Sequence, residues 1–416
     1  MRFAEFLDAE WKPALGCTEP AAVAHAASLA AAQGSGPVRQ VRLVMDPRTY
    51  KNCHAVGIPN SGGRTGVLWA LALGAHLADP SLGLGCFAAV DGAVLAAAQD
   101  LMDRRAIQVE VEASRIELYI DCTVVREGGR GRAVLEVEHT HLARLEADGT
   151  QAGGSPVRSG PGGLPSPRAL AGAMPIQDLR GLAATITPKD RERLREGVAF
   201  NLAMAEHGIS LLPAGFVPPP GQDRMTRLSR LVAAGVFSRM SGEPLMVMSL
   251  AGSGNKGITV SVPVTLWGRE GGHPQARIDE ALAFACLMTS ATTHHLGTLS
   301  AVCGAANAAG IGIALGILLL EGASPAQMDL AVANMVGNVA GMICDGAKIG
   351  CAMKAMTCVD AAFRSATLAL ADFGIPATDG IVGADGDSSL ANLGRLARRG
   401  MTGVDAEVLD IMQAKL

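Results

Sequence analysis

Aromatic side chains and charges are both scarce in this chain of 416 residues, at 3% and 18% of its composition. In their place stand 49% hydrophobic residues and 51 glycines, which is too apolar a composition for a disordered protein. The length allows two or three domains and a large core. We therefore expect a compact protein in which Ala- and Gly-rich helices pack closely.

Long runs of positive charge are missing too. The formal net charge is -4, and no segment offers the concentrated positive face that a nucleic-acid groove requires. We expect a small-molecule substrate and no nucleic-acid partner.

The aromatic belt and the basic cluster that flank a membrane span are also absent around the one long uncharged run, residues 299–320. This run meets the length criterion for a span. Its Gly and Ala content favours a buried central helix or helix pair instead, so we expect no membrane association.

The nine cysteines do not follow a secretory pattern. Their number is odd, they are spread widely, and no positively charged secretory region precedes them. A reducing cytoplasm fits this distribution best. Cys53, Cys86, Cys122 and Cys286 are expected to pack in the core.

Three other cysteines, Cys303, Cys344 and Cys351, lie in an almost uncharged stretch where three thiolates could bind iron away from bulk water. A cubane cluster held by three thiolates leaves one iron open, and an open Lewis acid can bind a substrate. On an unbroken helix, the seven residues from Cys344 to Cys351 would rise about 10 Å. We therefore expect a break at Gly346 and Gly350. Ordinary buried thiols are the alternative that this spacing leaves open.

Cys17 has a local reason to be reactive. Thr18 is a good N-cap and Pro20 suits the first turn of a helix, so the Cys17 thiol should lie at a helix N-terminus. The positive end of the helix dipole would lower the pKa of this thiol. A capping-loop residue without a chemical role is the alternative.

The loop GSGNKG, residues 252–257, is a candidate binding site. Its small residues let backbone amides approach a ligand, Ser253 and Asn255 add hydrogen bonds, and Lys256 adds charge. A carboxylate would suit this loop, and a simple tight turn is the alternative. The glycine spacing is not that of a Walker loop. The following residues, 259–266, alternate in the manner of a strand.

The remaining pattern predicts an α+β protein. Residues 1–147 should form a helix and sheet portion with a strand at 38–45 and a long antiparallel hairpin at 107–146. Residues 148–168, rich in Gly, Pro and Ser, should form a flexible linker. Residues 169–416 should be mainly helical and carry the cluster. The expected helices cover residues 4–15, 19–33, 65–78, 87–103, 175–184, 188–207, 223–241, 275–372 with a break in the cysteine region, and 386–414.

Two histidines of the hairpin, His139 and His141, share one strand face. No cysteine or carboxylate of suitable spacing completes a metal site with them. We expect a solvated sheet face there.

Five separated motifs, taken together and in order, resemble the bacterial and archaeal L-cysteine desulfidase family, which is related to the alpha part of iron-sulfur L-serine dehydratases. The likeness spans nearly the whole chain. The motifs are GCTEP at 16–20, KN at 51–52, GSGNKGI at 252–258, SAVC at 300–303 and GMICDGAKIGCAMK at 341–354.

The resemblance implies an oxygen-sensitive [4Fe-4S] cluster, no pyridoxal phosphate, and β-elimination of L-cysteine to sulfide, pyruvate and ammonia through 2-aminoacrylate. It implies Cys303, Cys344 and Cys351 as cluster ligands and Cys17 as the catalytic cysteine, which is our candidate base. These groups should converge where the two portions of the chain meet. The residues expected to bind the substrate are Thr18, Glu19, Lys51, Asn52, Ser253, Gly254, Asn255 and Lys256.

Three other functions remain open. The first is an iron-sulfur L-serine dehydratase, and the second is a non-catalytic iron-sulfur sensor or redox protein with four protein ligands. A fourth ligand at Cys358 is disfavoured, because a continuing helix would carry it about 10 Å beyond Cys351. The third is a pyridoxal-dependent lyase with Lys256, Lys348 or Lys354 as the Schiff-base residue. The sequence does not decide whether the protein is a homo-oligomer.

Overall fold

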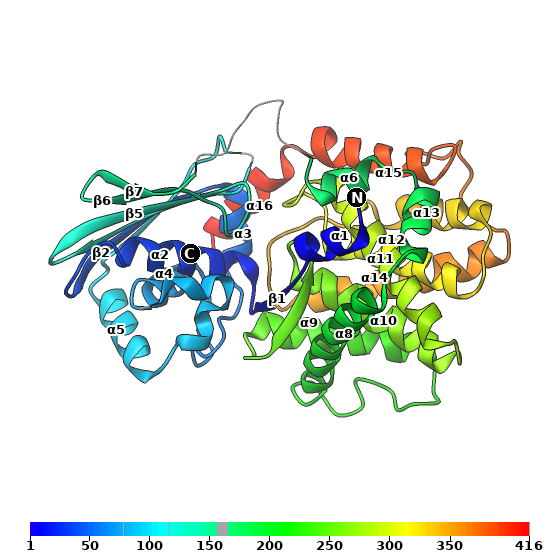
Figure 1. Ribbon diagram of the computed structural model, residues 1–416, viewed down its shortest axis with the longest axis horizontal. Coiled ribbons are helices and arrows are strands. Elements are labelled where there is room, and N and C mark those ends of the chain that lie inside the picture. Colours follow the sequence, from blue (N-terminus) through cyan, green and yellow to red (C-terminus); the bar gives the residue numbers. More distant parts are fainter. Residues whose placement is uncertain (78, 116, 156–164, 416) are drawn as a thin grey trace.

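The computed structural model describes residues 1–77, 79–115, 117–155 and 165–415. Figure 1 shows two portions side by side, a sheet with its own helices and a larger assembly of helices. The α+β class expected from the sequence is therefore confirmed.

A six-stranded sheet forms the framework of the first portion. Its strand order is β3-β2-β4-β5-β6-β7, and only the β2–β3 pair is parallel. The antiparallel hairpin expected at 107–146 is present as β4 and β5, which pair from Tyr119–Glu136 to Arg126–Gly129. Residues 107–111, at the start of the expected hairpin, instead form β3 and pair parallel with β2. The strands are β2 (Val38–Met45), β3 (Ile107–Val111), β4 (Tyr119–Arg126), β5 (Gly129–Glu136), β6 (Leu142–Ala147) and β7 (Thr150–Gly153).

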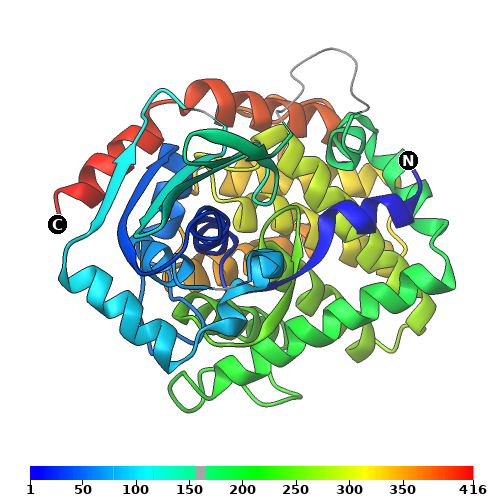
Figure 2. The same cartoon turned by 60° about the vertical axis from the view of Figure 1, so that its left-hand side comes forward.

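An Ala-rich helix, α2 (Thr18–Ala31), fills the space between this sheet and its companion helices. It packs on β4 and β5 on one side and on α4 on the other, and Figure 2 shows the sheet curving around it. Glycines permit the close approach, because a side chain at Gly131 would overlap Ala30 O and one at Gly74 would overlap Ala24. The companion helices are α3 (Pro47–Cys53), α4 (Val67–Gly74), η1 (Pro80–Ala89) and α5 (Gly92–Asp103).

The second portion is built around α12 (Gly304–Leu320), in which every residue from Ala306 to Leu320 is buried. The buried central helix expected within residues 299–320 is confirmed. Helices α10, α11, α13 and α14 surround it. The helices here are α1 (Phe3–Glu10), α6 (Pro167–Ala173), α7 (Ile176–Ala184), α8 (Pro188–Ile209), α9 (Arg224–Ser241), α10 (Gly254–Glu270), α11 (Gln275–Leu296), α13 (Pro325–Val339), α14 (Cys351–Leu370), α15 (Gly386–Arg395), η2 (Leu396–Gly400) and α16 (Val404–Gln413).

Within the described part of the chain, no single helix is long and apolar enough to cross a membrane. One bent pair, η1 with α5, meets the length and composition criteria only when its two helices, 95° apart, are taken together.

Residues 259–266 and 11–15 form other elements than the sequence predicts. Residues 259–266 belong to helix α10, although their apolar residues alternate. Nearly all of α10 is buried, so it has no polar face from which a helical period can be read. Residues 11–15 form strand β1 (Trp11–Leu15) instead of a helix, because they pair antiparallel with β8 (Met246–Leu250), more than 200 residues away.

The chain exchanges segments between the two portions. Phe3, Phe6 and Trp11 belong to the core of the helical portion, whereas α16 returns to contact α3 beside the sheet (Figure 1). The predicted linker, residues 148–168, includes strand β7 and the first residues of α6, while residues 156–164 lie outside the described residues.

We expect the substitution Gly131→Ala to lower the free energy of unfolding by about 2 kcal/mol, because the added methyl group overlaps the Ala30 carbonyl. Gly181→Ala in α7 is the matched control, because its methyl group meets nothing within 4 Å. The control should be neutral or slightly stabilising. Urea denaturation followed by circular dichroism measures both, and equal midpoints would contradict close packing of α2 on the sheet.

Candidate active site

One cavity of about 90 Å³ lies between the two portions. A single water needs about 10–15 Å³ on this measure, so the cavity has room for a group of several atoms. Its wall contains all the predicted site residues except Lys51 and Gly254. The predicted residues in the wall are Cys17, Thr18, Glu19, Asn52, Ser253, Asn255, Lys256, Cys303, Cys344 and Cys351.

Two backbone hydrogen bonds hold the cysteine segments together. Cys303 N donates to Met342 O at 2.8 Å, and Cys344 N donates to Ala301 O at 2.7 Å. Cys303 is the N-cap of α12, and Cys344 lies in the loop between α13 and α14. Cys351 is the first residue of α14, so the expected break between Cys344 and Cys351 is confirmed.

The three thiols influence one another electrostatically. Burial, together with neighbouring Cys344 and Cys351, raises the pKa of Cys303 to about 12. Burial also raises the pKa of Cys351, and Cys344 adds to this effect. Three thiolates at this site would repel one another, so a cationic group between them would be stabilising.

The donor set fits an iron-sulfur cluster. Thiolates are soft ligands of the kind that bind such clusters, and all nine cysteines are free. Across the ranges that the structure describes, no three His, Cys, Asp or Glu side chains are grouped as ligands of one metal ion.

Two half-buried lysines stabilise the Cys344 loop. Lys348 Nζ donates to Asp345 O at 2.9 Å, Lys354 Nζ donates to Ile343 O at 2.8 Å, and both ammonium groups contact the Asp345 carboxylate. Although burial opposes it, these two lysines lower the pKa of Asp345 to about 2. Neither lysine is part of the cavity wall, which disfavours both as Schiff-base residues.

Cys17 lies at the N-terminus of α2, as expected, although Cys17 itself and not Thr18 is the N-cap. The expected lowering of its pKa is wrong. Its Sγ donates to Glu19 Oε2 at 3.0 Å. Burial and the Glu19 charge raise the pKa of Cys17 well above its usual range, despite the opposing charge of Arg239. The helix N-terminus is thus outweighed by desolvation and by a neighbouring carboxylate.

Glu19 is a buried carboxylate with several donors. Thr18 Oγ1 donates to Oε2 at 2.9 Å, and Asn52 Nδ2 donates to Oε1 at 2.9 Å. Burial alone would raise the pKa of Glu19, but nearby His139 and the Cys17 and Thr18 hydrogen bonds lower it. Glu19 is therefore ionised at neutral pH beside a protonated Cys17.

The environment of His139 also differs from the sequence expectation. It is 8% exposed, in the turn between β5 and β6, and burial lowers its pKa, whereas His141 is half-buried. The solvated face expected from the sequence is wrong for His139. Glu19, with which His139 interacts electrostatically, lies 120 residues earlier in the chain, so no local pattern links the two.

Arg239 is a site residue that the sequence pattern did not single out. Its side chain is buried in the cavity wall, where Nη1 donates to Asn255 Oδ1 at 2.9 Å and Nη2 donates to Gly16 O at 2.8 Å. A side chain at Gly254 would overlap the Arg239 guanidinium, so a glycine at this position leaves space for the arginine. An arginine on the buried face of α9 was the signal that could have identified it.

The GSGNKG loop forms the N-terminus of α10, with Ser253 as its N-cap. Lys256 is buried, and its Nζ donates to Ala251 O at 3.1 Å. Burial, with a contribution from Arg168, lowers the pKa of Lys256 to about 7. The helix N-terminus, Arg239 and a partly protonated Lys256 make this wall suitable for an anion.

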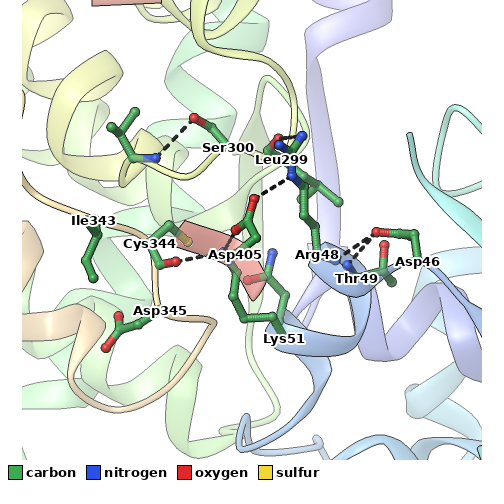
Figure 3. Close-up of polar contacts among 12 residues, drawn as sticks. Asp46, Arg48, Thr49, Lys51, Leu299, Ser300, Ile343, Cys344, Asp345 and Asp405 are labelled. Atoms are coloured by element: carbon green, nitrogen blue, oxygen red, sulfur yellow. Dashed lines mark hydrogen bonds and ion pairs between the residues drawn. The ribbon is translucent and has the colours of Figure 1, made fainter. Parts of the chain in front are cut away.

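Lys51 does not face the cavity. Its ammonium group donates to Cys344 O at 2.7 Å and to Asp405 Oδ1 at 2.5 Å (Figure 3). The expected substrate contact is therefore replaced by support of the Cys344 loop.

A larger cavity of about 670 Å³ adjoins the site and shares several residues with it. Its other lining residues include Arg168 and His139. Arg168 Nε donates to Glu10 Oε2 at 2.9 Å, and its Nη1 donates to Thr298 Oγ1 at 2.7 Å. The two cavities are therefore neighbours in the structure. The shared residues are Thr18, Gly252, Thr293, Gly297 and Thr298.

Comparison with known proteins gives two results. Residues 172–410 match the family model described as serine dehydratase alpha chain. The whole chain is similar to UPF0597 proteins of Geobacter sulfurreducens (37% identity, covering 99% of this chain and 98% of the relative), Oleidesulfovibrio alaskensis (37%, 100% and 98%) and Caldanaerobacter subterraneus (32%, 99% and 98%).

Stability of the metal-free protein should rise with pH because of Lys256. The folded protein releases the Lys256 proton near pH 7, whereas the unfolded chain keeps it to about pH 10.5. The unfolded state binds more protons in this window. We therefore expect the free energy of unfolding to rise by about 2 kcal/mol more from pH 7 to pH 9 in the wild type than in Lys256→Met. Urea denaturation at both pH values measures the gain.

The matched control for this prediction is Lys189→Met, because Lys189 is exposed. This variant should keep the pH dependence of the wild type. Parallel stability curves for wild type and Lys256→Met would mean that Lys256 is not neutralised by burial.

Proposed function

We propose a function from the premise that this chain belongs to the UPF0597 family and carries a serine dehydratase alpha chain domain at residues 172–410. The protein is an iron-sulfur-dependent lyase that eliminates sulfide from L-cysteine through 2-aminoacrylate, which hydrolyses to pyruvate and ammonia. One observation carries this proposal: a single cavity joins three cysteines, the Cys17–Glu19 pair and the N-terminus of α10.

Cys303, Cys344 and Cys351 would hold the cluster. A [4Fe-4S] cluster bound by three thiolates supplies an open iron, a Lewis acid that favours departure of the sulfur. A fourth ligand at Cys358 has little support, because this thiol donates to Ala306 O at 2.9 Å and is not part of the cavity wall.

The α10 wall binds and orients the substrate carboxylate. Ser253 and the following amides provide donors at the positive end of a helix, and Arg239 adds a fixed charge behind them. Arg239 is itself held by Asn255 and Gly16, so the charge is placed before the substrate arrives.

The Cys17–Glu19 pair acts as the base. Cys17 Sγ takes the α proton while its own proton passes to Glu19 Oε2, so the thiol ends unchanged and the carboxylate ends protonated. The 3.0 Å hydrogen bond supplies the path. This route does not require a free Cys17 thiolate, which the raised pKa of Cys17 disfavours.

A second candidate function is the dehydration of L-serine, favoured by the description of the matched domain. It uses the same groups with a hydroxyl as the leaving group. The non-catalytic alternative, an iron-sulfur sensor, would need neither the Cys17–Glu19 pair nor a route to it.

Anaerobically reconstituted protein should release sulfide and pyruvate from L-cysteine faster than it releases pyruvate from L-serine. The reverse order would favour the dehydratase.

Iron and acid-labile sulfide should be present in the wild type and should fall strongly in Cys344→Ala, because the variant removes one of three proposed ligands. Unchanged iron in this variant would remove Cys344 as a ligand.

The substitution Glu19→Gln should lower kcat by about 10²–10⁴-fold, because the amide cannot accept the Cys17 proton. Iron content should stay at the wild-type level. Glu196→Gln is the control, since Glu196 is exposed on α8. A Glu19→Gln enzyme with wild-type kcat would exclude the proposed proton path.

A further inference from the structure

We propose that Asp405, on the C-terminal helix α16, is a positioning residue. Through Arg48 and Lys51 it holds in place two cysteine loops, the one that leads from Leu299 to Cys303 and the one that contains Cys344. The inference rests on the proposed function in one respect, namely that these loops carry the cluster ligands. Asp405 lies outside the five sequence motifs.

Asp405 binds two cations of helix α3 at once. Its Oδ2 accepts from Arg48 Nε at 2.8 Å, and its Oδ1 accepts from Lys51 Nζ at 2.5 Å (Figure 3). Arg48 and Lys51 are three residues apart, so they project from the same face of α3. The one carboxylate therefore fixes the positions of both cationic groups.

Each cation also binds a carbonyl of one cysteine loop. Arg48 Nη1 donates to Leu299 O at 2.9 Å, four residues before Cys303. Lys51 Nζ donates to Cys344 O at 2.7 Å. Asp405 thus orients the two donors that hold these loops. It acts on the loops through Arg48 and Lys51.

Helix α3 is itself held in place by the hydrogen bonds of Asp46. Asp46 caps it, with Oδ1 accepting from Arg48 N and Thr49 N at 3.0 and 2.9 Å (Figure 3). Asp46 Oδ2 also accepts from Tyr119 N of β4 at 2.9 Å. The contacts therefore connect the central sheet to the cysteine loops through one short helix.

The Cys344 loop passes closely over this helix. Gly346 has a φ of +94°, and a side chain there would overlap the Lys51 carbonyl. The loop therefore has little freedom while Lys51 stays in place. Two independent features, the Lys51 hydrogen bond and the close approach at Gly346, determine its position.

Burial makes the Asp405 charge important. The Lys51 side chain is 1% exposed and that of Asp405 is 11% exposed. Removing one partner of a buried pair leaves the other charge uncompensated, which costs far more than losing a surface pair. Without Asp405, Lys51 would move toward water and release Cys344 O.

The test compares Asp405→Asn and Asp405→Glu with Asp410→Asn, a control on the exposed face of α16. In the metal-free full chain, the rate at which a maleimide labels Cys344 is followed by mass spectrometry. We expect about tenfold faster labelling in Asp405→Asn, partial rescue in Asp405→Glu and the wild-type rate in the control. Far-UV circular dichroism checks that each variant is folded.

In the reconstituted protein, the release of iron to a chelator should be about tenfold faster in Asp405→Asn than in the control. The absorption spectrum of the cluster should change as well. Wild-type rates of both labelling and iron release in Asp405→Asn would overturn the inference. If the wild type binds no iron, the proposed function fails, while Cys344 labelling still decides the role of Asp405.

Should Asp405→Asn fail to fold, Lys51→Met provides the same test, because Arg48 still pairs with Asp405 in that variant. Lys51→Met should speed the labelling of Cys344, which loses its donor. An unchanged Cys344 rate in a folded Lys51→Met protein would overturn the positioning role.

Discussion

The candidate site depends on the two backbone hydrogen bonds that join the segments around Cys303 and Cys344. They form a single antiparallel bridge between Val302 and Ile343. Helix α12 begins immediately after the first segment, and α14 begins shortly after the second, so the positive ends of two helices lie near the sulfurs. Such ends favour thiolates, which is the form that binds iron, and so oppose the burial that raises the pKa values of Cys303 and Cys351. A short bridge thus sets where the sulfurs lie and also affects their charge.

Buried charges determine how the two portions of the molecule meet. Arg239 of the helical portion donates to the Gly16 carbonyl, just before α2. In the other direction, Arg48 and Lys51 of α3 donate to the Leu299 and Cys344 carbonyls of the helical portion. Burial of such groups is costly unless each one has a partner. A relative shift of the two portions would leave several of these charges without partners, so the charges fix the geometry of the cavity.

Much of the fold and of the site could be predicted from local pattern. The break before Cys351 follows from helix geometry, and the hairpin β4–β5 follows from alternation and glycine at its turn. Residues 259–266 gave the wrong element, because a helix buried on all sides shows no amphipathic period. The pKa of Cys17 was predicted with the wrong sign, because the helix terminus was visible in the sequence whereas burial was not.

The sequence by itself determined which residues are candidates for the chemistry: four cysteines, one small-residue loop and the order in which they occur. Only the tertiary structure decided how these residues work together. It turned Lys51 away from the cavity toward Asp405, and it placed His139 beside Glu19. The physical reason is that ionisation and hydrogen bonding depend on neighbours and on burial. These neighbours come from segments more than 100 residues apart, which local sequence patterns do not connect.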